Sequence, residues 1–189
     1  MEIKTAVDVI DQMNAVGAKW CTAPFLQAVQ NLLGSSPPLW ILSGFSLLEG
    51  LISLKAAQLS TSCIERRKWE QRANRIIKMI KTWLQKGNVN VVHTYHILTA
   101  EYHVLKKNKA QAEESFKAGA KVAARNGFVQ DHALARELAG LYCVENGDEF
   151  RATYNFTLAH RTYLDWQAKS KADHLVSQFP KIIANEKLC

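Results

Sequence analysis

The sequence has few of the residues that build metal and redox sites. Its 189 residues include four cysteines, Cys21, Cys63, Cys143 and Cys189, which are scattered and form no C-x-x-C pair. Because zinc ribbons and dithiol redox motifs need that close spacing, neither is expected. Sparse cysteines in a chain of this length fit a reducing compartment, and we expect a cytoplasmic protein.

Motifs for nucleotide and hydrolytic chemistry are also missing. The nine glycines never form G-x-x-x-x-G-K-[ST], G-x-G-x-x-G or G-x-S-x-G. Three histidines, His93, His96 and His103, are spaced too widely for an ordinary metal site, so we expect surface or groove histidines.

Carboxylates do not suggest a catalytic pair either. Glu113, Glu114 and Glu137 are expected to lie on solvated helix faces, where glutamate is usually found. We therefore predict no catalytic residue, no cofactor and no metal ion, and expect that the chain is not an enzyme.

Long hydrophobic runs are limited to one segment, residues 39–54, which reads LWILSGFSLLEGLISL. A membrane-spanning helix needs about 20 apolar residues, and a charge at its centre is costly. Here Glu49 interrupts the run and Lys55 ends it. We expect a buried helix of a soluble fold, and a membrane partner is disfavoured.

Strand patterns are almost absent, whereas apolar residues recur at helical spacing along most of the chain. Ser62 and Glu65 stand at capping-box spacing and indicate a helix start. The pattern predicts an all-α chain with helices over about 5–16, 24–33, 39–59, 62–85, 89–105, 108–125, 129–145, 149–167 and 170–179.

A shift of about 40 residues aligns the chain with itself. Small residues coincide, as expected where antiparallel helices cross closely, and one aromatic residue per unit fills the adjacent groove. The repeated residues are Ala100, Ala112, Phe116 and Gly119 in one unit and Gly140, Ala152, Phe156 and Ala159 in the next.

Small residues at positions eight, twenty and twenty-seven, with an aromatic at twenty-four, resemble the tetratricopeptide repeat. This resemblance implies a stack of antiparallel helix pairs, an α-solenoid, with its clearest units near residues 93–127 and 131–167. We assign residues 61–189 to this repeat domain. Residues 1–60 are interpreted as N-terminal helices that form a cap or a degenerate repeat, since Trp40 to Leu47 resembles the opening of such a unit.

A second resemblance covers roughly the last 90 residues. The run AARNGFVQDHALARELA, residues 123–139, followed by Tyr163-Leu164, Trp166 and Phe179-Pro180, is similar to one family of helical repeats. In large signalling proteins these repeats follow an AAA-type ATPase segment and precede sensor and histidine-kinase, Ser/Thr-kinase or cyclase modules. The resemblance implies that the chain is part of such a protein. The catalytic modules themselves are not in this sequence.

The chain is basic, with a formal net charge of +7. The clearest cluster of basic residues lies on the helix predicted over residues 64–86. Its basic face is typical of a solvated surface, or of a surface that binds an anionic partner such as nucleic acid or a lipid membrane. Because Glu65 and Glu70 dilute this face, we favour the solvated surface and disfavour nucleic acid. Candidate interaction residues are Arg66, Arg67, Arg75, Lys78, His96, Glu101 and Glu137.

The function predicted from these patterns is that of a protein-interaction scaffold between modules of a signalling protein. A stack of helix pairs offers a groove for a peptide or a neighbouring domain. Two alternatives remain open. One is a small-molecule sensor or enzyme that uses the same groove, and the other is binding of nucleic acid or an anionic surface through the basic helix.

Overall fold

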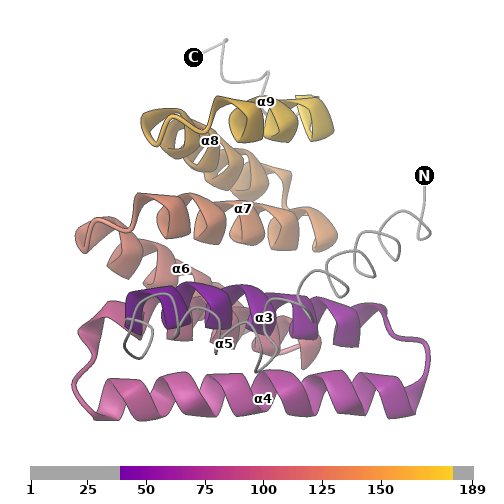
Figure 1. Ribbon diagram of the computed structural model, residues 1–189. Coiled ribbons are helices and arrows are strands. Elements are labelled where there is room, and N and C mark those ends of the chain that lie inside the picture. The colour runs from indigo at the N-terminus through magenta and orange to yellow at the C-terminus, as the bar shows by residue number, and fades with distance from the viewer. Residues whose placement is uncertain (1–38, 181–189) are drawn as a thin grey trace. The chain divides into compact units, whose positions relative to one another are not determined.

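The computed structural model describes residues 39–180 (Figure 1). Over this part of the chain it contains seven α-helices, one short 3-10 helix and no strand, which confirms the predicted all-α class. The helices predicted over residues 5–16 and 24–33 lie outside the described residues. The chain divides into two compact units, Met1–Lys86 and Gly87–Cys189.

The first unit contains two long helices that pack against each other, α3 (Leu39–Leu59) and α4 (Cys63–Gln85). Helix α3 buries Leu47, Leu54 and Ala57, and α4 buries Ala73, Ile76 and Ile80. Because α3 and α4 pack together, the units divide after Lys86, whereas the sequence analysis placed the boundary after residue 60.

The carboxylate that interrupts the hydrophobic segment has a partner on the neighbouring helix. Oε1 of Glu49 in α3 accepts a hydrogen bond from Nε of Arg72 in α4 at 2.9 Å, and Nη2 of Arg72 completes the ion pair at 2.8 Å. This pair gives a charge within an apolar helix a counterion, so Glu49 orients α3 toward α4. Of the helices within residues 39–180, none combines the length and the apolar character needed to cross a membrane.

The second unit follows from Gly87 and consists of consecutive helices, each packed on the next. Its elements are η1 (Val89–Val91), α5 (Val92–Leu105), α6 (Lys109–Arg125), α7 (Val129–Glu145), α8 (Glu149–Asp165) and α9 (Lys169–Gln178). The predicted bounds agree closely, except that the start of the fifth predicted helix is the 3-10 turn η1.

The turns between these helices recur at a constant interval. Residues with positive φ occur at Gly87, Lys107, Gly127, Gly147 and Gln167, each 20 residues after the last. From Lys107 onward each turn has the Schellman pattern, in which two amides return to the carbonyls of the last helical turn. These 6→1 bonds are Asn108 N to His103 O, Phe128 N to Ala123 O, Asp148 N to Cys143 O, and Ala168 N to Tyr163 O, at 2.8–3.0 Å.

Helix starts are less uniform than helix ends. Asn88 and Asp148 cap their helices, with side-chain oxygens 3.1 and 2.9 Å from the amides of Asn90 and Arg151. The helix start predicted at Ser62 is confirmed, since α4 begins at Cys63, but the capping hydrogen bond is not formed. Ser62 lies at the N-cap of α4, yet its side chain makes no capping hydrogen bond. The first residues of α4 are exposed, so the backbone amides of its first turn can be hydrogen-bonded by water.

All eight repeat residues named from the sequence are buried. Gly140 of α7 lies directly against the ring of Phe156 of α8, so a methyl group added there would be 2.6 Å from two ring carbons. Gly119 of α6 meets Ile97 of α5 in a comparable way, at 3.1 Å. Small residues thus allow consecutive helices of this unit to approach closely.

Candidate binding groove

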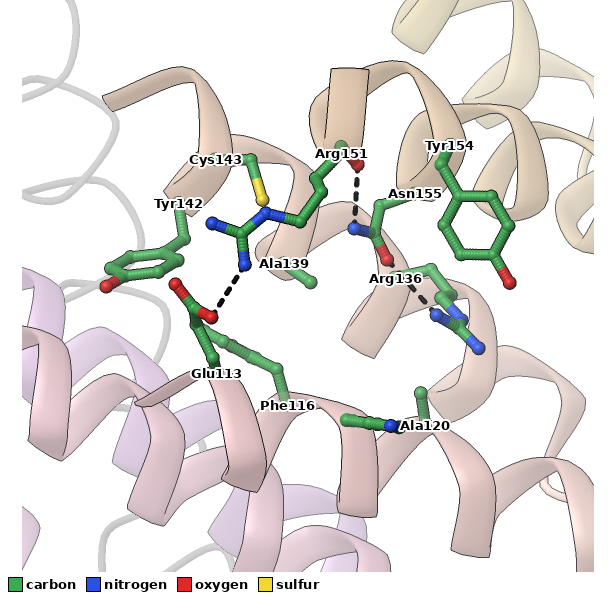
Figure 2. Close-up of a pocket in the computed structure, with 11 residues that line it drawn as sticks. Glu113, Phe116, Ala120, Arg136, Ala139, Tyr142, Cys143, Arg151, Tyr154 and Asn155 are labelled. Carbon is green, nitrogen blue, oxygen red and sulfur yellow. Dashed lines mark hydrogen bonds and ion pairs between the residues drawn. The ribbon is translucent and has the colours of Figure 1, made fainter. Parts of the chain in front are cut away.

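A groove of about 490 Å³ lies between α6, α7 and α8, within the second unit (Figure 2). Its floor is partly apolar, whereas its walls carry charged and aromatic side chains. It is lined by Glu113, Phe116, Lys117, Ala120, Arg136, Ala139, Tyr142, Cys143, Arg151, Tyr154 and Asn155. We call this feature the α6–α8 groove.

Arg136 of α7 is held in place by neutral groups. Its Nη1 donates to Oδ1 of Asn155 at 3.2 Å, and its Nε lies 3.4 Å from Nε2 of His132. The guanidinium carbon also lies 5.7 Å from the ring centre of Tyr154, within cation–π range. Burial, followed by the charge of Arg136, lowers the pKa of His132 below its usual value, so this imidazole is neutral at pH 7.

Asn155 owes its orientation to a second hydrogen bond. Its Nδ2 donates to the backbone carbonyl of Arg151 at 2.8 Å, which fixes Oδ1 toward Arg136. Asn155 is buried, with 9% of its surface exposed. The Arg136 guanidinium is therefore positioned before any ligand arrives.

Arg151 of α8 contrasts with Arg136, because carboxylates neutralise it. Its Nη1 donates to Glu113 of α6 at 2.6 Å, and its Nε donates to Asp148. The hydrogen bonds to Glu113 and Asp148 raise the pKa of Arg151, and those from Arg151 lower the pKa of Asp148. This network joins α6 to α8 at one end of the groove (Figure 2).

The groove does not present an activated nucleophile. Burial is the main cause that raises the pKa of the Cys143 thiol, and burial likewise raises the pKa of Tyr142. Both groups are thus protonated at neutral pH, and a thiol reacts as a nucleophile mainly through its thiolate. The arrangement can bind and orient an anionic or amphipathic group, using Arg136 as donor and Ala139 and the ring of Tyr154 as apolar contacts.

None of the seven candidate interaction residues lines this groove. Arg136 was not among the residues predicted from the sequence, although it lies on a stripe of α7 with His132, Ala139 and Cys143. Spacings of four, three and four residues place these side chains on one helix face, and this signal was present in the sequence. The sequence pattern could not predict that Asn155 accepts a hydrogen bond from Arg136, because Asn155 lies 19 residues away along the chain.

The basic candidates lie together on α4. Arg66, Arg67, Arg75 and Lys78 are all exposed, as predicted for the outer face of this helix. Arg75 also borders a shallow depression of about 350 Å³ with Glu49, Arg72 and Ile76.

The candidates on α5 have packing roles. His96 is half-buried beside the crossing of α5 and α6, where its Cβ is 3.4 Å from the position of a methyl group at Gly119. Burial lowers the pKa of His96, and the nearby Glu114 partly offsets this effect. Glu101, one turn further on, is half-buried as well.

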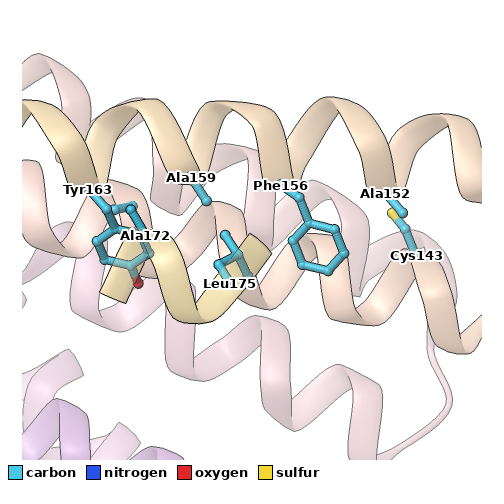
Figure 3. Packing of buried hydrophobic residues seen from close by; sticks show 8 residues of the cluster. Cys143, Ala152, Phe156, Ala159, Tyr163, Ala172 and Leu175 are labelled. Carbon is cyan, nitrogen blue, oxygen red and sulfur yellow. The ribbon is translucent and has the colours of Figure 1, made fainter. Parts of the chain in front are cut away.

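The solvated surface predicted for Glu137 is wrong. Glu137 of α7 is buried and accepts hydrogen bonds from the Tyr163 hydroxyl of α8 at 2.6 Å and from Lys171 of α9 at 2.7 Å. Figure 3 shows Tyr163 beside Ala172 at the α8–α9 contact. A carboxylate can be buried when such donors replace water, and here it links three helices.

The surface or groove position predicted for His93 is also wrong, because His93 is buried and has its own partners. His93 retains 2% of its surface exposure, its ring stacks on Phe128 at 4.2 Å, and Nε2 lies 2.8 Å from Oδ2 of Asp131. His93 therefore fastens the start of α5 to the start of α7. Within residues 39–180, no group of three or more His, Cys, Asp or Glu side chains is arranged to hold a metal ion.

Comparisons of the chain with protein-family descriptions, with curated proteins and with solved structures find no match.

Proposed function

We propose that this chain is a protein-interaction module that binds a peptide segment in the α6–α8 groove. The observation that carries this proposal is the fixed guanidinium of Arg136 beside the exposed ring of Tyr154. Tyr154 is 56% exposed and Phe150, one turn earlier on α8, is 86% exposed. Arginine and large aromatic residues contribute most of the energy at protein interfaces.

The proposed architecture is a tetratricopeptide-like stack of antiparallel helix pairs, an α-solenoid. Its support is the constant interval of 20 residues between turns, together with the short connections that require each helix to reverse direction. Such stacks use their surface grooves for peptides and neighbouring domains.

We extend the proposal to the cellular role on the basis of the sequence resemblance alone. The chain would act in the cytoplasm as a scaffold between modules of a larger signalling protein, next to an ATPase segment and ahead of a kinase or cyclase. It would bind its partner without catalysis, cofactor or metal. The raised pKa of Cys143 and the absence of a convergent acid–base pair in the groove support a binding role.

Selection from a library of random 12-residue peptides displayed on phage, with the full chain immobilised, tests the binding role. We expect enrichment of a consensus, and synthetic consensus peptides should shift backbone amide resonances of residues lining the α6–α8 groove. Failure to enrich any consensus above an uncoated control would overturn the proposal. Turnover of a small substrate would instead favour the alternative of an enzyme or sensor, because the groove is also large enough for a small ligand.

A second candidate function rests on α4. Arg66, Arg67, Arg75 and Lys78 are exposed cations on one helix, and a helix of this kind can bind an anionic lipid surface or nucleic acid. Retention on vesicles containing phosphatidylserine, or on single-stranded RNA, that falls steeply with salt would support this function. A quadruple glutamine variant at these positions should lose such retention, and equal retention of the two proteins would exclude it.

A further inference from the structure

Arg136 differs from the other arginines for which the structure records partners in the described residues. Arg72 is paired with Glu49, and Arg151 is paired with Glu113 and Asp148. Within residues 39–180, the only hydrogen-bond acceptors recorded for Arg136 are the uncharged His132 and Asn155. Its positive charge therefore lacks a counterion in a partly desolvated position, where a charge–charge interaction is stronger than in open water.

The surroundings of Arg136 show which anion fits. The groove is lined by three cationic side chains, Lys117, Arg136 and Arg151, and by one carboxylate, Glu113. Since Glu113 and Asp148 already neutralise Arg151, a positive charge remains at Lys117 and Arg136. The planar guanidinium offers parallel N–H donors that match the two oxygens of a carboxylate.

The apolar floor next to Arg136 favours a peptide over a polynucleotide. Phe116 and Ala120 line the groove but are buried, so an aliphatic or aromatic side chain would contact the half-buried Ala139 and the exposed ring of Tyr154. A nucleic-acid backbone would instead require a row of cations along its phosphates. One oriented guanidinium beside an apolar surface fits a short peptide in which an acidic residue neighbours an apolar one.

We infer that the α6–α8 groove recognises an acidic peptide segment, with an aspartate or glutamate carboxylate bound by Arg136 and an adjacent apolar side chain packed on Ala139 and the exposed ring of Tyr154. This inference rests on the proposed function and specifies its ligand. Lys117 adds long-range attraction, and the Tyr154 ring lies 5.7 Å from the guanidinium carbon of Arg136, so it supports the binding arginine from the side of α8.

The test uses peptides recovered from the display selection on the full chain. We expect the consensus to contain Asp or Glu beside an apolar residue. Replacing that acid by Asn or Gln in a synthetic peptide should weaken binding by about tenfold or more, the usual contribution of a charge-assisted hydrogen bond. Arg136→Gln should produce a similar loss, and combining the two changes should add little, as expected for directly interacting groups.

Two further variants separate this contact from general charge and from folding. Arg125→Gln removes the same charge from the exposed end of α6 and should leave affinity within about twofold. Tyr154→Ala alters an exposed ring, so it should weaken binding of the acidic peptide while preserving the thermal unfolding midpoint.

The outcomes distinguish the inference from the proposed function. A consensus without an acidic residue, or one whose binding is unchanged by either the Asn or Gln peptide or a folded Arg136→Gln variant, would overturn the inference and leave the binding module standing. Recovery of no consensus would overturn both. The peptide substitution needs no protein variant, so the inference can be refuted even if Arg136→Gln fails to fold.

Discussion

Single residues decide how closely the helices of the second unit approach. Gly140 has a buried aromatic ring where its side chain would begin, and the ring of Phe156 is fully buried and stacked on Phe179 at 4.4 Å. Because Phe156 lies between Gly140 and Phe179, it has little room to move. The absence of a side chain at Gly140 is therefore a requirement of packing.

Gly140→Ala should destabilise the protein. Overpacking of this kind costs about 1–3 kcal/mol, and the better helix propensity of alanine offsets part of it. We expect a net loss of about 1 kcal/mol or more in the free energy of unfolding, measured by urea denaturation.

Gly44→Ala is the matched control. Gly44 lies inside α3, is exposed, and has nothing within 4 Å of the place that a methyl group would occupy, so alanine should stabilise α3 by about 0.5–1 kcal/mol. Equal effects of the two substitutions would show that the contact between Gly140 and Phe156 is not tight.

The buried hydroxyl of Tyr163 predicts a dependence of stability on alkaline pH. Burial, followed by the hydrogen bond to Glu137, raises the pKa of Tyr163 well above its usual value of 10.0. Above pH 10 the unfolded chain therefore releases a proton that the native protein keeps. The contribution of Tyr163 to the free energy of unfolding is therefore fully present below pH 10 and decreases as the pH rises above 10.

Tyr163→Phe should reduce that loss. Between pH 10 and 12 we expect its free energy of unfolding to fall less steeply than that of the wild type, although the variant is less stable at pH 7 because Glu137 loses a donor. Tyr154→Phe removes a hydroxyl from an exposed ring and should retain the wild-type slope. Parallel slopes for all three proteins would contradict the role of Tyr163.

The sequence predicted buried residues well where apolar or small side chains recur, as at Ala112 and Phe156. It failed for Glu137 and His93, because a polar residue is buried only when particular partners surround it. Those partners, Tyr163 and Asp131, are 26 and 38 residues away along the chain. Helical periodicity reports the face on which a residue lies but not which side chain from another helix will meet it.

At the scale of elements, the turns show why some helix ends could be read from the sequence and others could not. Gly127 and Gly147 mark their turns, since glycine adopts positive φ without strain. Lys107 and Gln167 adopt the same conformation without this signal, at φ of 59° and 61°. The end predicted at about residue 167 lies two residues beyond the end of α8 at Asp165, whereas the end predicted at residue 105 matches α5 although Lys107 is not a glycine.

Gln167→Gly should stabilise the protein. It relieves a left-handed conformation that costs a non-glycine residue about 1–2 kcal/mol, and the greater freedom of glycine in the unfolded chain reduces the gain to about 0.5–1 kcal/mol. Thermal and urea denaturation measure the change. Gln111→Gly places the same substitution in an exposed position within α6, where it should destabilise by about 1 kcal/mol. Destabilisation by both substitutions would argue against strain at Gln167.

At the scale of the whole molecule, the second unit contains its own core. One buried cluster includes Phe116 and Tyr142, and the other surrounds Phe156 and Leu175 (Figure 3). Both clusters are formed entirely by residues that follow Gly87. The sequence repeat predicted helix pairing in this region, but it could not show that α4 belongs with α3, because amphipathic helices do not encode which neighbour covers them.

A fragment of residues 87–189 should therefore fold by itself. We expect a helical far-ultraviolet circular dichroism spectrum and a single cooperative thermal transition, because the contacts that define this unit lie within it. A fragment that starts at residue 109 and lacks α5 serves as comparison, since it loses the partner of α6 and should melt at a lower temperature. A gradual, non-cooperative loss of helix in the longer fragment would show that the second unit needs the first.

The constant interval between turns also determines which changes in chain length the second unit can accommodate. One residue inserted in the middle of α7 would rotate everything after it by about 100°, turning the buried stripe of that helix toward water. A residue inserted in a turn would leave both stripes in place and alter only the local connection. A duplicated block of 40 residues would preserve every face and extend the groove-bearing surface. Length can therefore change in this protein by whole helix pairs, or by small additions at the turns.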